Sequence, residues 1–563
     1  MKKLHKLSAL ALAIAGIATT NVAHALNPWT DGAPDFTIYT SGGAAQDIAY
    51  QEAVFEALSV PGSVDVFQDV LTGSSNGSRF TAFYFTGAST LTDPALRGKK
   101  ILLEKRSLGA AGYGVVPLIA NINLDHLDIF HSATSQLSAT WTNTTVNSNI
   151  GGTTYAVPFH AASITNANAA TFLTSTKSHG GFTGVDAAAL LKPGTENYPD
   201  PVKEVSTNAL TAGWISGYKT KDLTPLTRIP TGGLVYGVGV TLDLYKVLQA
   251  AQKASGTLPA STVIGAYDQA SLPTLSRNFL AALLQGNIQH WSNVEVNVGG
   301  TLKPLNDTSF LTAAGVSAPT NDKVAVGRRN TGAAIGAVAY AKLLNYPYAE
   351  SAVAPAQATP TTTTDETNTA PIVKSPGGAS GTESLLVDWQ AGTNTSNLNA
   401  LAAKYWGVAI SSADRNTAVT AAGTGGKAYR FVKIDGYAPT IENVASGNYP
   451  LWAEGEVLVN PTVGTTHEVS LFTDFGKALS TIAIAAKVDT ALIQAWGQTG
   501  VFATTVTDAG AIDVPFLASH PIVPFTHQAG DGYTHLGIVP WVYDNFSVGP
   551  TGAGATGAFI ELQ

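Results

Sequence analysis

The sequence predicts an α/β fold in which helices cover a mostly parallel sheet. Short apolar runs alternate with helix-like stretches along much of the chain, as expected where strands are followed by covering helices. A strand-like run also passes through glycines into a helix-like stretch near the N-terminus. With 563 residues, of which 45% are hydrophobic, the chain can bury large cores and is expected to form two or more lobes.

The first strand and helix lie near the start of the chain. Residues 36–39 predict a buried strand, residues 41–43 (Ser-Gly-Gly) a tight turn, and residues 47–58 a helix. Three further strand-like runs follow, at 64–70, 79–86 and 100–104. Residues 131–200 are rich in Ser, Thr, Asn and Gly, which predicts loops and short strands inserted in the first lobe.

Alternation is clearest in the second half. The pattern predicts strands and helices in the order strand 234–240, helix 242–252, helix 275–286, strand 323–327, helix 333–344, helix 380–389, strand 406–410, helix 472–487 and helix 491–496. Residues 354–368 are of low complexity and predict a surface loop rather than a domain boundary.

The N-terminus predicts export. Residues 1–25 combine a basic start, an apolar run and a final Ala-His-Ala, which is typical of a cleaved secretory signal peptide. No cysteine occurs, so disulfides, a thiol nucleophile and thiolate metal sites are excluded. No later apolar run is long enough to predict a membrane span. We therefore expect a periplasmic or secreted protein.

Charge and motifs exclude several function classes. The formal net charge is −8 and only 12% of residues are charged, so no basic field favours nucleic acid. The motifs of serine hydrolases, zinc proteases and nucleotide-binding loops are absent, and we predict no enzyme activity, catalytic residue or cofactor. His520, His527 and His535 are spaced by seven and eight residues, which fits no helical metal motif, so no metal site is predicted.

The turn at 41–43 can favour an anion. A strand that leads through glycines into a helix start directs free backbone N–H groups toward one point. Gly42 and Gly43 would allow close approach of a ligand, although many such turns are only connections.

Four segments, in the same order along the chain, resemble the bacterial phosphate-binding proteins that serve ABC transporters. Residues 434–451 resemble that family's segment with a Gly-x-x-Pro-Thr start and a Gly-x-Tyr-Pro-Leu end. Residues 275–291 resemble its helix with a Gly and a Trp at the end, 323–334 its arginine-bearing strand and turn, and 41–45 its opening glycine-rich loop.

The resemblance implies a two-lobed type II periplasmic-binding fold with the ligand in the interlobe cleft. Lobe 1 would comprise residues 26–237 and 412–563, and lobe 2 residues 238–411. The lobes would close by rotation about the crossing strands. A small anionic ligand and an ABC transporter permease would be the partners.

Site residues are implied position by position. Arg328 stands at the family's anion-binding arginine, with the adjacent Arg329 as a rival. The remaining implied ligand residues are Ser41, Gly42, Gly43, Ser107, Ser216, Thr331 and Gly332.

Two positions depart from the family's pattern. Ala45 replaces a hydroxyl-bearing threonine, and Gly217 replaces an aspartate that accepts a proton from protonated phosphate. Asp222 and Asp125 are the two candidates to replace that aspartate. The expected function is capture of phosphate or a related oxyanion. The alternative is a secreted or surface-assembly protein that keeps the fold and has lost phosphate binding.

Overall fold

The computed structural model describes residues 25–70, 78–191, 194–199, 223, 226–347, 352–491, 493–505 and 522–526. The predicted signal peptide, apart from Ala25, therefore lies outside the described residues, as do Ser216, Gly217, Asp222 and the three C-terminal histidines. Within the described part, no single helix is long and apolar enough to cross a membrane. The helices at Thr466–Leu479 and Ala483–Asp489, bent by 59° at the break between them, together have the length and composition of a membrane span.

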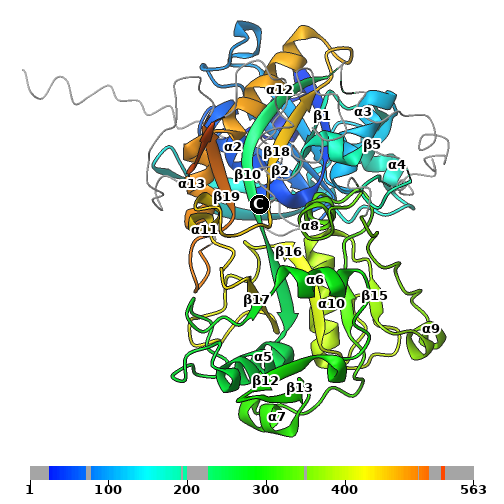
Figure 1. Ribbon diagram of the computed structural model, residues 1–563. Coiled ribbons are helices and arrows are strands. Elements are labelled where there is room, and N and C mark those ends of the chain that lie inside the picture. Colours follow the sequence, from blue (N-terminus) through cyan, green and yellow to red (C-terminus); the bar gives the residue numbers. More distant parts are fainter. Residues whose placement is uncertain are drawn as a thin grey trace, which may run out of the picture.

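A mixed 16-stranded sheet runs through two lobes that lie one above the other in Figure 1. Its main path is β15-β14-β16-β10-β18-β9-β1-β4-β3-β2-β7-β6. The strands on this path, in chain order, are β1 Phe36–Gly42, β2 Asp65–Gln68, β3 Phe80–Thr86, β4 Lys100–Arg106, β6 Thr142–Ile150, β7 Thr153–Ala161, β9 Gly180–Thr183, β10 Thr227–Thr241, β14 Ala325–Gly327, β15 Ile372–Lys374, β16 Gly407–Ser412 and β18 Trp452–Val459. The predicted α/β class is confirmed.

Four strands join this path from the side, and two small sheets stand apart. The joining strands are β11 Thr274–Leu275, β17 Tyr429–Ile434, β19 Val501–Thr505 and β20 Ile522–Thr526. The separate pairs are β5 Leu124–Leu127 with β8 Leu173–Thr176, and β12 Glu295–Val298 with β13 Thr301–Pro304.

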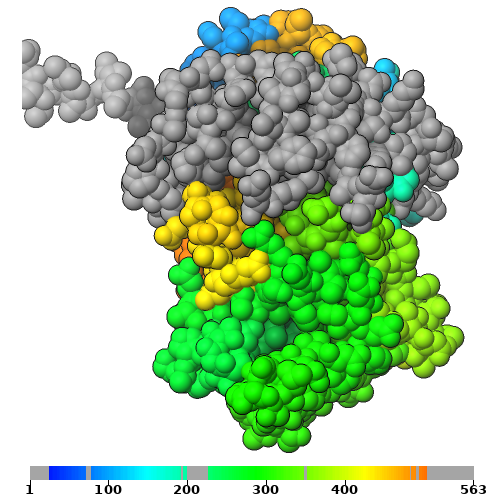
Figure 2. All heavy atoms as spheres, viewed as in Figure 1, coloured from blue at the N-terminus to red at the C-terminus, as the bar shows by residue number. Residues whose placement is uncertain are grey.

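Helices flank the sheet in both lobes. They are α1 Pro28–Asp31, α2 Asp47–Ala53, α3 Val116–Ala120, α4 Ala169–Phe172, α5 Leu242–Ser255, α6 Arg277–Leu284, α7 Thr308–Ala314, α8 Ala334–Leu344, α9 Thr363–Asn368, α10 Gly378–Ala391, α11 Ile441–Ala445, α12 Thr466–Leu479 and α13 Ile482–Ala491. Short tight helical turns include η1 Ala44–Gln46, η4 Ala111–Gly114 and η6 Ala187–Leu190. Figure 2 shows one face of the lower lobe, which is mainly green.

Strand β10 passes from one lobe to the other. Its first part, Thr227–Val235, pairs antiparallel with β18 in the upper lobe. Its last part pairs with β16 from Tyr236 and with β17 from Val238, both in the lower lobe. We keep the names lobe 1 for the upper body and lobe 2 for the lower one. The predicted boundaries at 237/238 and 411/412 stay a prediction, although β17, which pairs with β10 in lobe 2, follows the second of them.

Several predicted elements differ from the structure at their ends. Strand β1 continues through Gly42, so the predicted turn at 41–43 begins only at Gly43. The region 131–200 contains a hairpin of two nine-residue strands, β6 and β7, which are longer than the short strands predicted there.

The predicted helix 472–487 is in fact two helices. Strong apolar spacing continues across the break, but the Ser480 hydroxyl donates to the carbonyl oxygens of Gly476 and Lys477 at 3.2 and 3.0 Å. The Thr481 hydroxyl donates to Ala478 O at 2.8 Å. These bonds satisfy carbonyl groups of the last turn and end α12. The predicted helix at 491–496 is also wrong, because α13 ends at Ala491 and Gln494 forms a bridge with Gly497.

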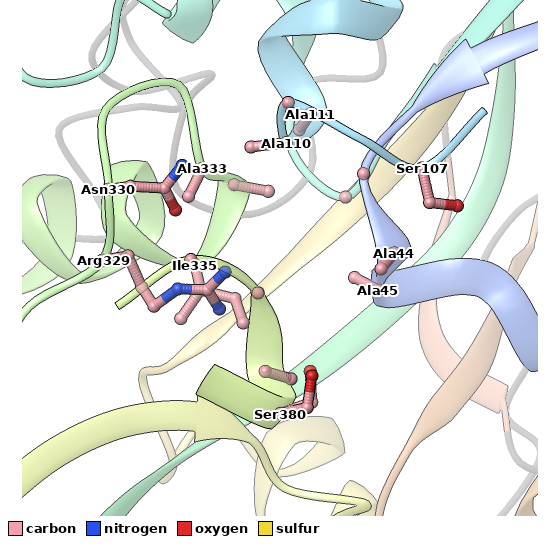
Figure 3. A pocket seen from close by; sticks show the side chains of 18 of the residues that line it. Ala44, Ala45, Ser107, Ala110, Ala111, Arg329, Asn330, Ala333, Ile335 and Ser380 are labelled. Atoms are coloured by element: carbon pink, nitrogen blue, oxygen red, sulfur yellow. The ribbon is translucent and has the colours of Figure 1, made fainter. Parts of the chain in front are cut away.

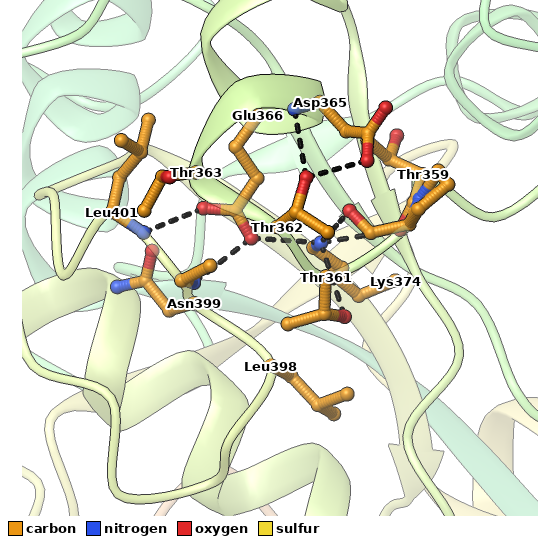
Figure 4. A network of polar contacts seen from close by, with 12 residues as sticks. Thr359, Thr361, Thr362, Thr363, Asp365, Glu366, Lys374, Leu398, Asn399 and Leu401 are labelled. Carbon is orange, nitrogen blue, oxygen red and sulfur yellow. Dashed lines mark hydrogen bonds and ion pairs between the residues drawn. The ribbon is translucent and has the colours of Figure 1, made fainter.

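The segment predicted as a loop at 354–368 contains helix α9. Thr362 caps this helix by accepting from the Asp365 N–H. Figure 4 shows what holds the segment in place: the fully buried Glu366 carboxylate forms an ion pair with Lys374 at 2.8 Å and accepts the N–H groups of Ala400 and Leu401. The segment is therefore anchored by a buried polar network.

Candidate functional site

A cavity of about 410 Å³ lies between the two lobes. Lobe 1 lines it with the start of η1 and the loop before η4, including Gly43, Ala44, Ala45, Ser107, Ala110 and Ala111. Lobe 2 lines it with the β14–α8 loop and the start of α10, including Arg329, Asn330, Ala333, Ile335, Gly378 and Ser380. Figure 3 shows these two groups facing the same space from different elements.

The charged residues that line the cavity are all arginines. They are Arg79, Arg329 and Arg415, and the described lining contains no aspartate or glutamate. Arg79 has an ion pair with Asp69 at 2.6 Å, and Arg415 lies 3.8 Å from Glu383. The lining thus carries positive charge that these carboxylates offset only in part.

Arg329 is the least compensated of the three. Its side chain is 6% exposed, and its Nε has no hydrogen-bond partner among the described residues. Burial lowers the pKa of Arg329 to about 10, so the guanidinium stays charged at neutral pH. Figure 3 shows the guanidinium directed into the cavity. A buried cation of this kind is costly unless an anion accompanies it.

The starts of α8 and α10 add neutral donors. Among the residues that the structure describes, no side chain caps either helix: the N-cap residues are Ala333 and Gly377. In contrast, side chains cap α6, α7 and α12 through Ser276, Asp307 and Thr465. First-turn N–H groups without a side-chain acceptor favour an anion. Ser380, in the first turn of α10, adds a hydroxyl that points into the cavity in Figure 3.

Two predicted hydroxyl ligands are engaged within the protein. The Ser41 hydroxyl is fully buried and donates to Tyr113 O at 2.9 Å. The Ser107 hydroxyl lies at the cavity but donates to Asp47 Oδ1 at 3.2 Å and accepts from Lys105 Nζ. Neither hydroxyl proton is directed at the cavity.

Arg328 lies beside the cavity rather than in its lining. Its Nη1 is 3.0 Å from Glu196 Oε2, and its Nε donates to Ser375 Oγ at 3.0 Å. Glu196 belongs to residues 194–199, a short segment that we call the strap. The strap also contacts lobe 2 through Gln357, whose amide donates to Glu196 Oε1 at 3.2 Å. The Glu196 carboxylate thus already pairs with Arg328, the arginine that the resemblance assigns to the ligand.

Of the remaining predicted ligand residues that the structure describes, one lines the cavity and three do not. Gly43 lines the cavity, whereas Gly42 packs against Phe182 and, like Thr331 and Gly332, is absent from the lining. Gly332 has a φ of +72° and lies against Pro199 of the strap; its carbonyl accepts from Gly112 N at 2.9 Å. Through this hydrogen bond, Gly332 connects lobe 2 to lobe 1. Asp125, the described candidate acceptor for a phosphate proton, does not line the cavity either.

The start of α10 was not predicted to belong to the site, although a helix was predicted at 380–389. Gly377-Gly378 precedes a predicted helix just as Gly42-Gly43 does, and this repeated pattern could have identified it. The side chains of Asn330, Ser380 and Arg415 were also missed. No group of three or more potential metal ligands occurs in the described part of the chain.

A buried hydrogen-bond chain beneath β1 has the residue types of a catalytic triad. Glu104 Oε2 lies 2.5 Å from His126 Nδ1, and Ser178 Oγ lies 3.1 Å from His126 Nε2. Because Ser41 donates to a carbonyl, Ser178 donates to Ser41 at 3.1 Å and must accept from His126 Nε2–H. His126 therefore cannot act as a base toward Ser178.

Comparisons with known proteins give a distant likeness. No family model and no curated protein matches the chain. A putative phosphate ABC transporter substrate-binding protein from Clostridium perfringens is 14% identical over 49% of this chain and 72% of that chain, with a TM-score of 0.25. A phosphate transport receptor from Vibrio cholerae is 14% identical over 50% and 76%, with a TM-score of 0.25. PstS from Borrelia burgdorferi is 11% identical over 59% and 85%, with a TM-score of 0.23.

Proposed function

We propose that this protein is an extracytoplasmic solute-binding protein that captures phosphate or a related oxyanion between its lobes without chemical conversion. The observation that carries the proposal is Arg329, a buried cation in an interlobe cavity whose Nε has no hydrogen-bond partner in the described part of the chain. The uncapped starts of α8 and α10 supply further donors. The ligand arginine in this proposal is Arg329 rather than Arg328, since Glu196 already neutralises Arg328.

We also expect the site to show little preference for phosphate over sulfate. Hydrogen phosphate carries a proton, which binds best where a carboxylate accepts it. The described cavity lining holds no carboxylate. We therefore propose a site that distinguishes anions by their charge and shape rather than by whether they carry a proton. Export through the 1–25 signal peptide and delivery to an ABC transporter permease complete the proposed role.

The test is isothermal titration of the mature protein, stripped of bound anion, with phosphate and with sulfate. Arg329→Met should abolish binding of both anions, because it removes the uncompensated cation. Arg328→Met is the matched control and should retain binding if circular dichroism shows the same fold. Loss of binding in Arg328→Met alone would instead favour the sequence-based assignment.

One observation favours the alternative, a surface-assembly protein without an anion ligand. Strand β6 lies at one end of the main sheet path, and its sequence TNTTVNSNI contains neither charge nor proline. Natural edge strands usually carry such residues to prevent pairing with other chains. Absence of any heat with phosphate and sulfate, together with self-association of the wild-type protein, would support this alternative.

A further inference from the structure

We infer that the ligand is an organic anion, whose charged group lies at Arg329 and whose uncharged body lies against an alanine-rich wall of the cavity. The inference rests on the proposed function and narrows its ligand class. Three features of the cavity carry it: its size, an apolar stretch of its lobe 1 lining, and the engagement of Ser107.

Size is the first feature. The cavity volume of about 410 Å³ falls within the range of about 300–1,000 Å³ that is typical of sites for drug-sized molecules. A tetrahedral oxyanion has only five heavy atoms and would leave most of this space to water. The cavity is therefore large enough for an anionic group with an attached body.

Three polar side chains of lobe 2 line the cavity close together. Arg329 and Asn330 come from the β14–α8 loop, and Ser380 comes from the first turn of α10. Figure 3 shows the three on this side of the cavity. The charged group of the ligand belongs here, because the desolvated guanidinium and the two uncapped helix starts lie together.

One stretch of the lobe 1 lining offers apolar side chains, beside the polar Ser78, Arg79 and Ser107. Ala44 and Ala45 of η1 and Leu108, Ala110 and Ala111 near η4 form this part of the lining, which we call the alanine wall. The hydroxyl of Ser107, next to the wall, donates a hydrogen bond to Asp47. A fully ionised oxyanion against these side chains would lose hydration without gaining hydrogen bonds from them, whereas an apolar body gains from leaving water.

The test compares three probes on the wild-type protein by isothermal titration: inorganic phosphate, phenyl phosphate and phenol. Phenyl phosphate should bind about tenfold or more tightly than inorganic phosphate, since apolar groups in a fitted pocket contribute on this scale. Phenol should bind far more weakly, because it lacks the charged group.

A variant then locates the body of the ligand. Ala45→Leu adds bulk at the alanine wall and should remove most of the advantage of phenyl phosphate over inorganic phosphate. Ala418→Leu, at an exposed loop position, is the control. Because the probe comparison uses the wild-type protein, the inference stays testable even if Ala45→Leu misfolds.

The outcomes separate the inference from the proposed function. Equal or tighter binding of inorganic phosphate would overturn the inference and leave the proposed function standing. No binding of either phosphate would overturn both. Binding of phenol as tight as that of phenyl phosphate would show an uncharged ligand and would overturn the anion site itself.

Discussion

At the scale of single residues, proton positions decide which side chains are available to a ligand. The chain Glu104–His126–Ser178–Ser41 ends on the Tyr113 carbonyl, which only accepts, so each donor along it is assigned. Burial raises the pKa of Glu104 well above its usual range and lowers that of His126 well below it. We assign a protonated Glu104 and a neutral His126. The Ser41 hydroxyl therefore belongs to this buried hydrogen-bond chain and donates to the Tyr113 carbonyl rather than to a ligand.

Asp489 predicts a pH dependence of stability. Its side chain is fully buried, and burial raises its pKa to about 9, although the Val501 N–H donates to Oδ1 at 2.9 Å and opposes the shift. The unfolded chain has an aspartate pKa of about 3.9. Between these values the folded state keeps a proton that the unfolded state has lost, so the stabilising contribution present below pH 4 declines as pH rises toward 9.

Asp489→Asn should remove this dependence, because the amide cannot ionise and its oxygen can still accept from Val501. The midpoint of thermal unfolding of the variant, relative to wild type, should be higher at pH 8 than at pH 5. Other titrating groups are common to both proteins and cancel in the difference. A difference that stays constant between pH 5 and pH 8 would contradict the buried, protonated carboxyl.

At the scale of elements, the Thr-rich segment 354–368 depends on one ion pair. Glu366 and Lys374 are 0% and 1% exposed, and Lys374 Nζ also donates to the carbonyls of Thr359 and Pro360. The helix α9 and the strand β15 are thus connected through charged groups in the protein interior. Composition alone predicts no such role for this segment.

Glu366→Ala should destabilise the protein by about 3–5 kcal/mol, because it leaves a buried ammonium group without its carboxylate. The double variant Glu366→Leu/Lys374→Met should recover a large part of that loss, since it removes both charges. Urea unfolding of the three proteins measures this. Equal destabilisation by the single and double changes would mean that packing rather than charge holds the segment.

Elements with a clear repeat were predictable, and contacts distant in sequence were not. Alternation predicted β3 and β4, and apolar spacing predicted α5. The break at Ser480 was missed because apolar spacing continues through it, and hydroxyl bonding to carbonyls leaves no periodic signal. Arg328 and Arg329 are adjacent and chemically identical, and what distinguishes them includes a contact distant in sequence: Arg328 pairs with the strap residue Glu196, 132 positions away.

At the scale of the whole molecule, the lobes contact each other through more than the crossing strand. The Gly112 N–H of lobe 1 donates to Gly332 O of lobe 2 at 2.9 Å, and Pro199 of the strap packs against both glycines. The Glu196–Arg328 ion pair, with side chains 15% and 7% exposed, fastens the strap to lobe 2. These contacts hold the cavity between the lobes.

Glu196→Ala should loosen this connection. Amide hydrogen exchange at Gly112 and Gly332 should become faster, and the radius of gyration from small-angle scattering should increase in the absence of anion. The control is Arg277→Met, which breaks the half-exposed Arg277–Asp435 pair within lobe 2 and should change neither quantity. Unchanged exchange in Glu196→Ala would show that the Glu196–Arg328 ion pair does not hold the lobes together.

Strand β10 also limits how this protein can be taken apart or recombined. Its 15 residues complete the hydrogen bonding of β18 in one lobe and of β16 and β17 in the other. A gene fragment that encodes either lobe without the whole of β10 leaves strands with bare edges. Exchange of a lobe between relatives must therefore carry the matching half of this strand.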